Sequence, residues 1–206
     1  MGDVMKKYLI PLIGFLAMAG ISLNVMISAF ETPYSLMRGL SLFRYYTLQS
    51  NLIVGVYFLL LGSKVLNKYD IFNRFFGGVT IYITITFVVF AIFLQGTYHP
   101  TGLQGVVNIV SHYIVPILAI LYFVIIKNEL TFKRLDMLWW IIYPLIYIIF
   151  MVIYGGITGD YLYPFFQVSE IGVNGLILTI VLLVGFFMGL SFLLMKIVSK
   201  KEITNH

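Results

Sequence analysis

The chain has 206 residues, of which 61% are hydrophobic and 10% are charged, and its formal net charge is +5. Soluble domains carry roughly 25% charged residues, so this composition excludes a water-soluble globular protein. It predicts an integral membrane protein that forms a single polytopic domain over residues 1–206.

Six apolar runs reach or approach the roughly 20 residues that a helix needs to cross a bilayer. The second and fifth runs are at the short end of that range. The first run follows Lys6 and Lys7 but is longer than the usual apolar core of a signal peptide, so we expect a retained helix. The pattern predicts an all-α bundle of six transmembrane helices near residues 8–30, 46–62, 72–95, 106–126, 138–154 and 172–196.

The basic residues are distributed unevenly between the segments that connect these runs. All but Arg38 and Arg44 of the 13 Lys and Arg residues lie on one alternating set of segments, which includes both chain ends. Cytoplasmic segments are enriched in Lys and Arg, so we expect both termini in the cytoplasm and a location in the cell membrane. Because the basic residues form no continuous face, we expect no nucleic-acid partner.

Two polar clusters interrupt this hydrocarbon-like sequence. The first, FRYYTLQSN at residues 43–51, opens the second run, and the second holds Asn108, Ser111 and His112 in the fourth run. Both runs begin on the predicted outer side, so Thr47 and His112 lie at a similar shallow depth. We therefore expect these two helices to be neighbours, with the two side chains within hydrogen-bond reach.

Each member of this pair has a structural and a functional interpretation. A Thr at a helix start commonly caps the helix or bonds a carbonyl one turn back. Thr47 as a nucleophile would need a base nearby. An ionisable residue such as His112 inside a membrane indicates function, since its desolvation is costly, and a neutral imidazole can act as that base. Pro116 removes the amide that would bond the His112 carbonyl, which predicts a kink.

Three further polar residues are candidates to orient the pair or to donate hydrogen bonds to an oxyanion: Asn51, Ser50 and Asn108. Asn51 lies four residues after Thr47, on the same helix face. Its structural alternative is to join two helices, which Asn often does in membranes.

The sequence offers few residues that could support a metal site, a Schiff base or ion transport. Of the three histidines, His206 lies in the C-terminal tail, and the chain has no cysteine, so we expect no metal site. No Lys lies in the middle of a run to form a Schiff base, and no carboxylate lies there to relay ions. We expect no cofactor. The G-x-x-x-G pattern at residues 185–189 is too common in such helices to indicate an oligomer.

Four fragments occur in an order that resembles a known family. They are residues 43–51, the N-x-x-S-H-Y-x-x-P pattern of 108–116, the Y-P-x-x-Y pattern of 143–147, and residues 155–165. Together they resemble the androgen-induced gene and androgen-dependent tissue factor pathway inhibitor regulator family, especially its bacterial predicted six-transmembrane proteins. Eukaryotic members hydrolyse fatty-acid esters of hydroxy fatty acids with an intramembrane Thr nucleophile and a His. The matching motifs carry these roles to Thr47 and His112.

The resulting hypothesis is an intramembrane lipid-ester hydrolase with an internal cavity towards the outer leaflet. A membrane lipid or lipid ester would be its substrate, Thr47 its nucleophile and His112 its base. Two alternatives stay open. One is a non-catalytic protein that binds or transports a lipid or small molecule. The other is a structural protein in which Thr47 and His112 bridge two helices.

Overall fold

The structure is a computed structural model that describes residues 2–63 and 70–198. Lys64, Lys68, Lys200 and Lys201, which are predicted to be cytoplasmic, and His206 lie outside the described residues. The described residues form helices and no strands. Five helices are long and apolar enough to cross a membrane, and a sixth apolar helix, Tyr46–Gly62, is shorter. The predicted all-α class is confirmed, and these helices indicate a multi-pass membrane protein.

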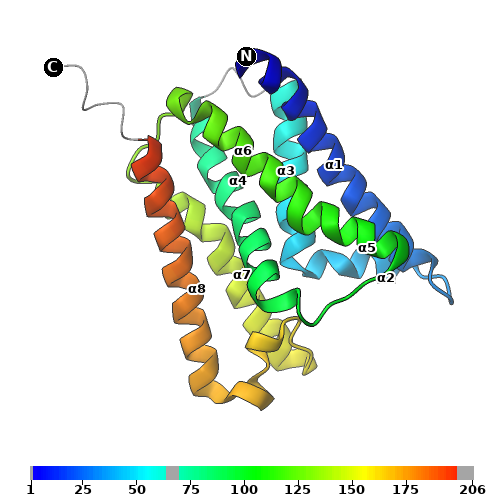
Figure 1. The fold of residues 1–206 in the computed structure, drawn as a ribbon. Coiled ribbons are helices and arrows are strands. Elements are labelled where there is room, and N and C mark those ends of the chain that lie inside the picture. Colours follow the sequence, from blue (N-terminus) through cyan, green and yellow to red (C-terminus); the bar gives the residue numbers. More distant parts are fainter. Residues whose placement is uncertain (1, 64–69, 199–206) are drawn as a thin grey trace. The chain divides into compact units, whose positions relative to one another are not determined.

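Two compact units make up the chain, Met1–Leu130 and Thr131–His206, and each is described by itself. The first unit contains α1, a short α2, α3, α4, and a long rod in which α5 continues into α6 (Figure 1). Its elements are α1 Gly2–Phe30, α2 Leu36–Ser41, η1 Leu42–Arg44, α3 Tyr46–Gly62, α4 Asp70–Val89, η3 Phe90–Leu94, α5 Gly102–Ile109, η4 Val110–Ile114, α6 Val115–Ile126 and η5 Lys127–Glu129.

The helix bounds differ from the predicted ones mainly where a helix continues past its apolar run. α1 begins at Gly2 rather than near residue 8, and the rod begins at Gly102 rather than near 106. An apolar run measures the length of helix that faces hydrocarbon, whereas backbone hydrogen bonding continues into the polar ends. Hydropathy therefore locates the helices but not their ends.

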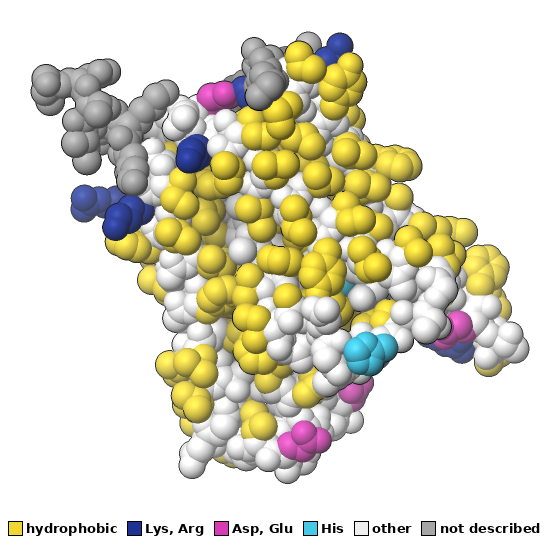
Figure 2. Space-filling view, in the orientation of Figure 1, with side chains coloured by type: hydrophobic (Ala, Val, Ile, Leu, Met, Phe, Trp, Pro, Cys, Tyr) yellow, Lys and Arg dark blue, Asp and Glu magenta, His cyan; other side chains and the backbone are white. Residues whose placement is uncertain are grey.

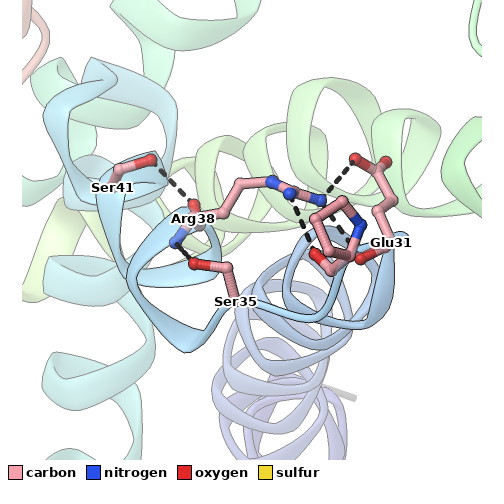
Figure 3. Close-up of polar contacts among 5 residues, drawn as sticks. Glu31, Ser35, Arg38 and Ser41 are labelled. Atoms are coloured by element: carbon pink, nitrogen blue, oxygen red, sulfur yellow. Dashed lines mark hydrogen bonds and ion pairs between the residues drawn. The ribbon is translucent and has the colours of Figure 1, made fainter.

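The segment before α3 contains α2 and folds around Arg38 (Figure 3). Ser35 caps α2, its Oγ accepting from the Arg38 backbone N–H at 3.3 Å. The guanidinium donates to the carbonyls of Pro33 at 2.9 Å and Glu31 at 3.2 Å, and lies 3.7 Å from the Glu31 carboxylate. These contacts connect the start of α2 to the end of α1.

α1 and α3 pack closely through small residues. A Cβ added at Gly55 would lie 2.7 Å from the Met18 sulfur, and one added at Gly14 would lie 3.1 Å from Leu59. Further along, Tyr57, Phe58, Phe76 and Tyr122 form a cluster of stacked and edge-on rings that joins α3, α4 and α6.

Large hydrophobic side chains are exposed along the helices of the first unit. Hydrophobic side chains cover α1 and α6, and Lys and Arg side chains appear near the end where α1 begins (Figure 2). At that end the Lys6 ammonium pairs with the Glu129 carboxylate and joins the start of α1 to η5. This unit thus has a basic end, which is opposite to the end where α3 begins.

The second unit is a helical hairpin of α7 (Asp136–Thr158) and α8 (Val168–Val198), with the short η6 (Pro164–Phe166) in their connection. The Asp136 carboxylate accepts from the Lys133 backbone N–H at 2.8 Å, and Gly159 ends α7 with φ 73°. Gly172, with φ 67°, interrupts α8 near its start.

Candidate functional site

The predicted neighbours meet through a hydrogen bond within the first unit. Thr47, the second residue of α3, and His112, in the middle of η4, are joined by a 3.1 Å contact between Oγ1 and Nε2. This confirms the predicted contact between two residues that are 65 positions apart in the sequence. Its catalytic role stays a prediction.

The local structure explains why Thr47 is available for this contact. The N-cap of α3 is Tyr45, so Thr47 does not cap the helix. The carbonyl one turn back, that of Phe43, accepts instead from the Gln49 side chain at 2.7 Å. Gln49 thus satisfies the Phe43 carbonyl, and the Thr47 hydroxyl faces the imidazole.

The protonation pattern of the imidazole follows from its second partner. The Nδ1 atom of His112 lies 3.0 Å from the backbone carbonyl oxygen of Asn108. A carbonyl can only accept a hydrogen bond, so Nδ1 carries the hydrogen in this arrangement. In the neutral ring Nε2 then has a lone pair, which accepts the hydrogen of the Thr47 hydroxyl. The geometry is that of a general base next to a hydroxyl nucleophile.

Two π-helical turns bring together the imidazole of His112 and the ring that stacks on it. η4 carries His112, and η3 begins with Phe90, whose buried ring stacks on the imidazole with centroids 3.8 Å apart and planes at 22°. Single π turns inside α-helices are frequent at functional sites. The sequence does not point to Phe90, because an apolar residue in an apolar run has no distinguishing pattern.

The π-helical turn η4 lies directly before Pro116, where the sequence predicts a kink. Pro116 lies at the start of α6, and the Val115 N–H immediately after η4 bonds the Val110 carbonyl, five residues back. The wider turn lies before the proline, which has no N–H to continue the α-helical pattern.

Asn51 is placed to hold the two helices together. Its Nδ2 donates to the Thr47 carbonyl at 2.8 Å and to the Ser111 carbonyl at 3.1 Å, and the residue is 1% exposed. Both amide hydrogens are therefore used, one on each helix. This position serves to orient the pair and leaves no hydrogen for an oxyanion. The buried Oδ1 of Asn51 has no partner among the described residues.

Ser50 lies behind the pair, in contact with α4. Its hydroxyl is 3.1 Å from the Thr47 carbonyl and 2.6 Å from the Thr86 hydroxyl, and the residue is fully buried. The Thr47 carbonyl can only accept a hydrogen bond, whereas the Thr86 hydroxyl can either donate to Ser50 Oγ or accept from it. Ser50 thus connects α3 to α4 rather than facing a ligand.

Asn108 contributes to the site mainly through its backbone, whose carbonyl orients His112. Its side-chain Oδ1 is buried without a partner among the described residues, while the residue as a whole is partly exposed. Of the three oxyanion candidates, Asn108 is the one whose side-chain donor hydrogens make no hydrogen bond in the described part of the chain. An oxyanion donor, if it is one of the three, is therefore Asn108.

Thr47 and His112 are each partly exposed. Tyr113 follows His112 and donates to the Gln95 side chain at 2.5 Å, which fixes the connection between η3 and η4. No cluster of three potential metal ligands occurs among the described residues.

Comparisons with family models, with curated proteins and with solved structures find no match for this chain.

Proposed function

We propose that this protein is an intramembrane hydrolase of lipid esters, with Thr47 as its nucleophile and His112 as its base. The observation that supports the proposal most is the Thr47 Oγ1 to His112 Nε2 contact of 3.1 Å, together with the Asn108 carbonyl on Nδ1. The carbonyl takes the orienting position that an Asp holds in a Ser-His-Asp triad.

In the first half of the reaction the Thr47 Oγ attacks the acyl carbonyl of the ester and its proton moves to Nε2 of His112. The tetrahedral intermediate collapses, the bond to the alcohol oxygen breaks, and the leaving alcohol takes the proton from Nε2. The acyl group remains on Thr47 as an ester. The positive charge on the ring is transient and lies against the Asn108 carbonyl dipole.

In the second half a water molecule attacks the acyl-Thr47 ester and gives its proton to Nε2. Collapse releases the carboxylic acid and returns the proton to the Thr47 oxygen. The oxyanion formed in both halves requires a donor, and we assign this role to the side-chain amide of Asn108. One oxyanion donor is typically worth about 10²–10³-fold in rate.

The proposed substrate is of the type cleaved by the family that the motifs resemble, a fatty-acid ester of a hydroxy fatty acid. Membership of that family is part of the proposal. So are a sixth span formed by α3, both termini in the cytoplasm, a cavity towards the outer leaflet and a location in the cell membrane. The exposed apolar side chains of α5, among them Val106 and Ile109, suit a substrate that arrives laterally from the bilayer.

The experiment measures hydrolysis of a long-chain ester by the purified full chain in nanodiscs. Thr47→Val keeps the shape of the side chain but removes the hydroxyl, and His112→Ala removes the base. Each change should reduce turnover by about 10²–10⁴-fold. The double variant should be little worse than either single one, because the two residues act as a unit. Thr47→Ser should keep measurable activity.

Thr84→Val is the matched control, because the Thr84 hydroxyl bonds the Thr80 carbonyl of its own helix at 2.7 Å. It should leave turnover unchanged. A fluorophosphonate should form an adduct on Thr47, visible by peptide mass spectrometry. Wild-type turnover by Thr47→Val would show that the hydroxyl has a structural role. Lipid binding without turnover or adduct in the wild-type chain would instead favour a binding or transport protein.

A further inference from the structure

A cavity of about 630 Å³ lies at the basic end of the first unit, away from Thr47 and His112. Its wall combines the start of α1, the end of α3, the start of α4 and the end of α6. Thr47 lies at the opposite end of α3, roughly 20 Å away along the helix axis. The volume is within the range of small-molecule sites, about 300–1,000 Å³. The proposed hydrolase reaction does not use this cavity.

Hydrogen-bond donors from three helices line the cavity. Lys7 comes from α1, Asn73 from α4 and Tyr122 from α6. The Tyr57 hydroxyl also lies in the wall and donates to the Phe72 carbonyl at 3.3 Å, which leaves its oxygen as an acceptor. An ammonium, an amide and a phenol in one wall suit a ligand that offers several acceptor oxygens.

The charges favour an anion. Among the described residues, the cavity wall holds one cation, Lys7, and one carboxylate, Glu129. That carboxylate is already paired with the Lys6 ammonium, whose side chain is 20% exposed. No ion pair of Lys7 is recorded among the described residues. The positive charge that a ligand meets in the cavity is therefore that of Lys7.

The rest of the wall is apolar and continues onto the outside of the helices. Ile10 and Pro11 of α1 and Leu59 of α3 line the cavity, and Pro11 and Leu59 are exposed. The rings of Tyr57, Phe58 and Tyr122, which contact one another, also line it. A ligand with an anionic head and hydrocarbon chains would match both parts. A free ion would use only the polar part.

We propose that this cavity binds the phosphate of an anionic phospholipid, with Lys7 as its counter-ion and Asn73 and Tyr122 as hydrogen-bond donors. The acyl chains would lie along α1 and α3 in the bilayer. Basic pockets between transmembrane helices are known settings for anionic lipid headgroups. The site is independent of the Thr47–His112 pair.

The test compares thermal unfolding of the purified full chain in detergent with added dioleoyl phosphatidylglycerol or dioleoyl phosphatidylcholine. The anionic lipid should raise the unfolding midpoint of the wild type by roughly 5 °C more than the zwitterionic lipid does. Lys7→Gln should lose most of this difference. Lys196→Gln removes the same charge from the last turn of α8 and should keep it.

Glu129→Gln should change the effect of the anionic lipid on the unfolding midpoint in the opposite direction to Lys7→Gln. It removes a carboxylate from the cavity and releases the Lys6 ammonium, so the effect of the anionic lipid should increase. A loss of packing alone would not produce this gain. A parallel arm adds inorganic phosphate, which should not reproduce the rise because it lacks the chains.

Three results would overturn the proposal. The first is an equal midpoint for both lipids in the wild type. The second is an equal loss in the Lys7 and Lys196 variants, which would indicate general attraction to basic residues. The third is an equal rise with inorganic phosphate, which would assign the cavity to a free anion.

Discussion

At the scale of residues, each polar side chain of the cluster at the start of α3 has a different partner. Gln49 satisfies the Phe43 carbonyl, Ser50 reaches Thr86 on α4, and Asn51 bonds both α3 and η4. Thr47 is the member whose hydroxyl faces the imidazole. The cluster therefore builds the surroundings of the Thr–His pair as well as one of its partners.

Asn51 provides the residue-scale prediction. Asn51→Leu keeps a similar volume but removes two hydrogen bonds to buried carbonyls, so it should lower stability by about 1–3 kcal/mol. A loss of this size corresponds to a fall in thermal midpoint of roughly 2–12 °C. It should also reduce ester turnover, because the spacing between α3 and η4 is no longer held.

The measurement is a thermal scan in detergent beside the turnover assay, with Thr84→Val as a control for loss of a polar group within one helix. An unchanged midpoint in Asn51→Leu would mean that the inter-helix bond to Ser111 adds nothing to stability.

At the scale of elements, glycines decide where segments approach closely. In the second unit, a Cβ added at Gly155 would lie 2.2 Å from the Tyr161 ring, whereas one added at the neighbouring Gly156 would meet nothing within 4 Å. The connection after α7 thus packs its aromatic side chain directly on the helix backbone. Close packing therefore requires a glycine at position 155 but not at the adjacent position 156.

This pair provides a matched test. Gly155→Ala should destabilise the protein by about 1–3 kcal/mol, since the ring must move. Gly156→Ala should stabilise it by up to about 1 kcal/mol, because alanine loses less backbone entropy in a helix. Thermal midpoints of the two variants should therefore move in opposite directions. Equal shifts would contradict the close contact with Tyr161.

At the scale of the whole molecule, the question is which helices cross the membrane. α3 has 17 residues and spans about 25 Å, less than the roughly 30 Å of a typical hydrocarbon core. The bilayer can thin locally to match a short helix. The basic residues at one end and the Thr–His site at the other require α3 to cross if the proposed orientation holds.

Because the chain has no cysteine, each introduced thiol is unique. We predict that a membrane-impermeant maleimide labels intact cells carrying Ser41→Cys or Thr101→Cys, but not those carrying Ser63→Cys or Arg134→Cys. A permeant maleimide should label all four. Labelling of both Ser41→Cys and Ser63→Cys by the impermeant reagent would show that α3 does not cross.

The sequence alone determined the helical class, the approximate positions of the helices and the identity of the Thr–His pair. These follow from local properties: long apolar runs form helices in a membrane, and polar residues inside such runs are rare enough to be noticed. The similar depth of Thr47 and His112 in the membrane follows from their positions in the two apolar runs and from the direction in which each run is predicted to cross. The division into two units did not follow, since composition hardly changes along the chain.

Only the tertiary structure decided how the pair is held. The Asn108 carbonyl on Nδ1, the two donors of Asn51 and the ring of Phe90 depend on the rotation of each helix about its axis. One extra residue in a π turn changes that rotation, and hydropathy does not record it. The cavity beside Lys7 likewise depends on how four helix ends meet, which no single segment of sequence encodes.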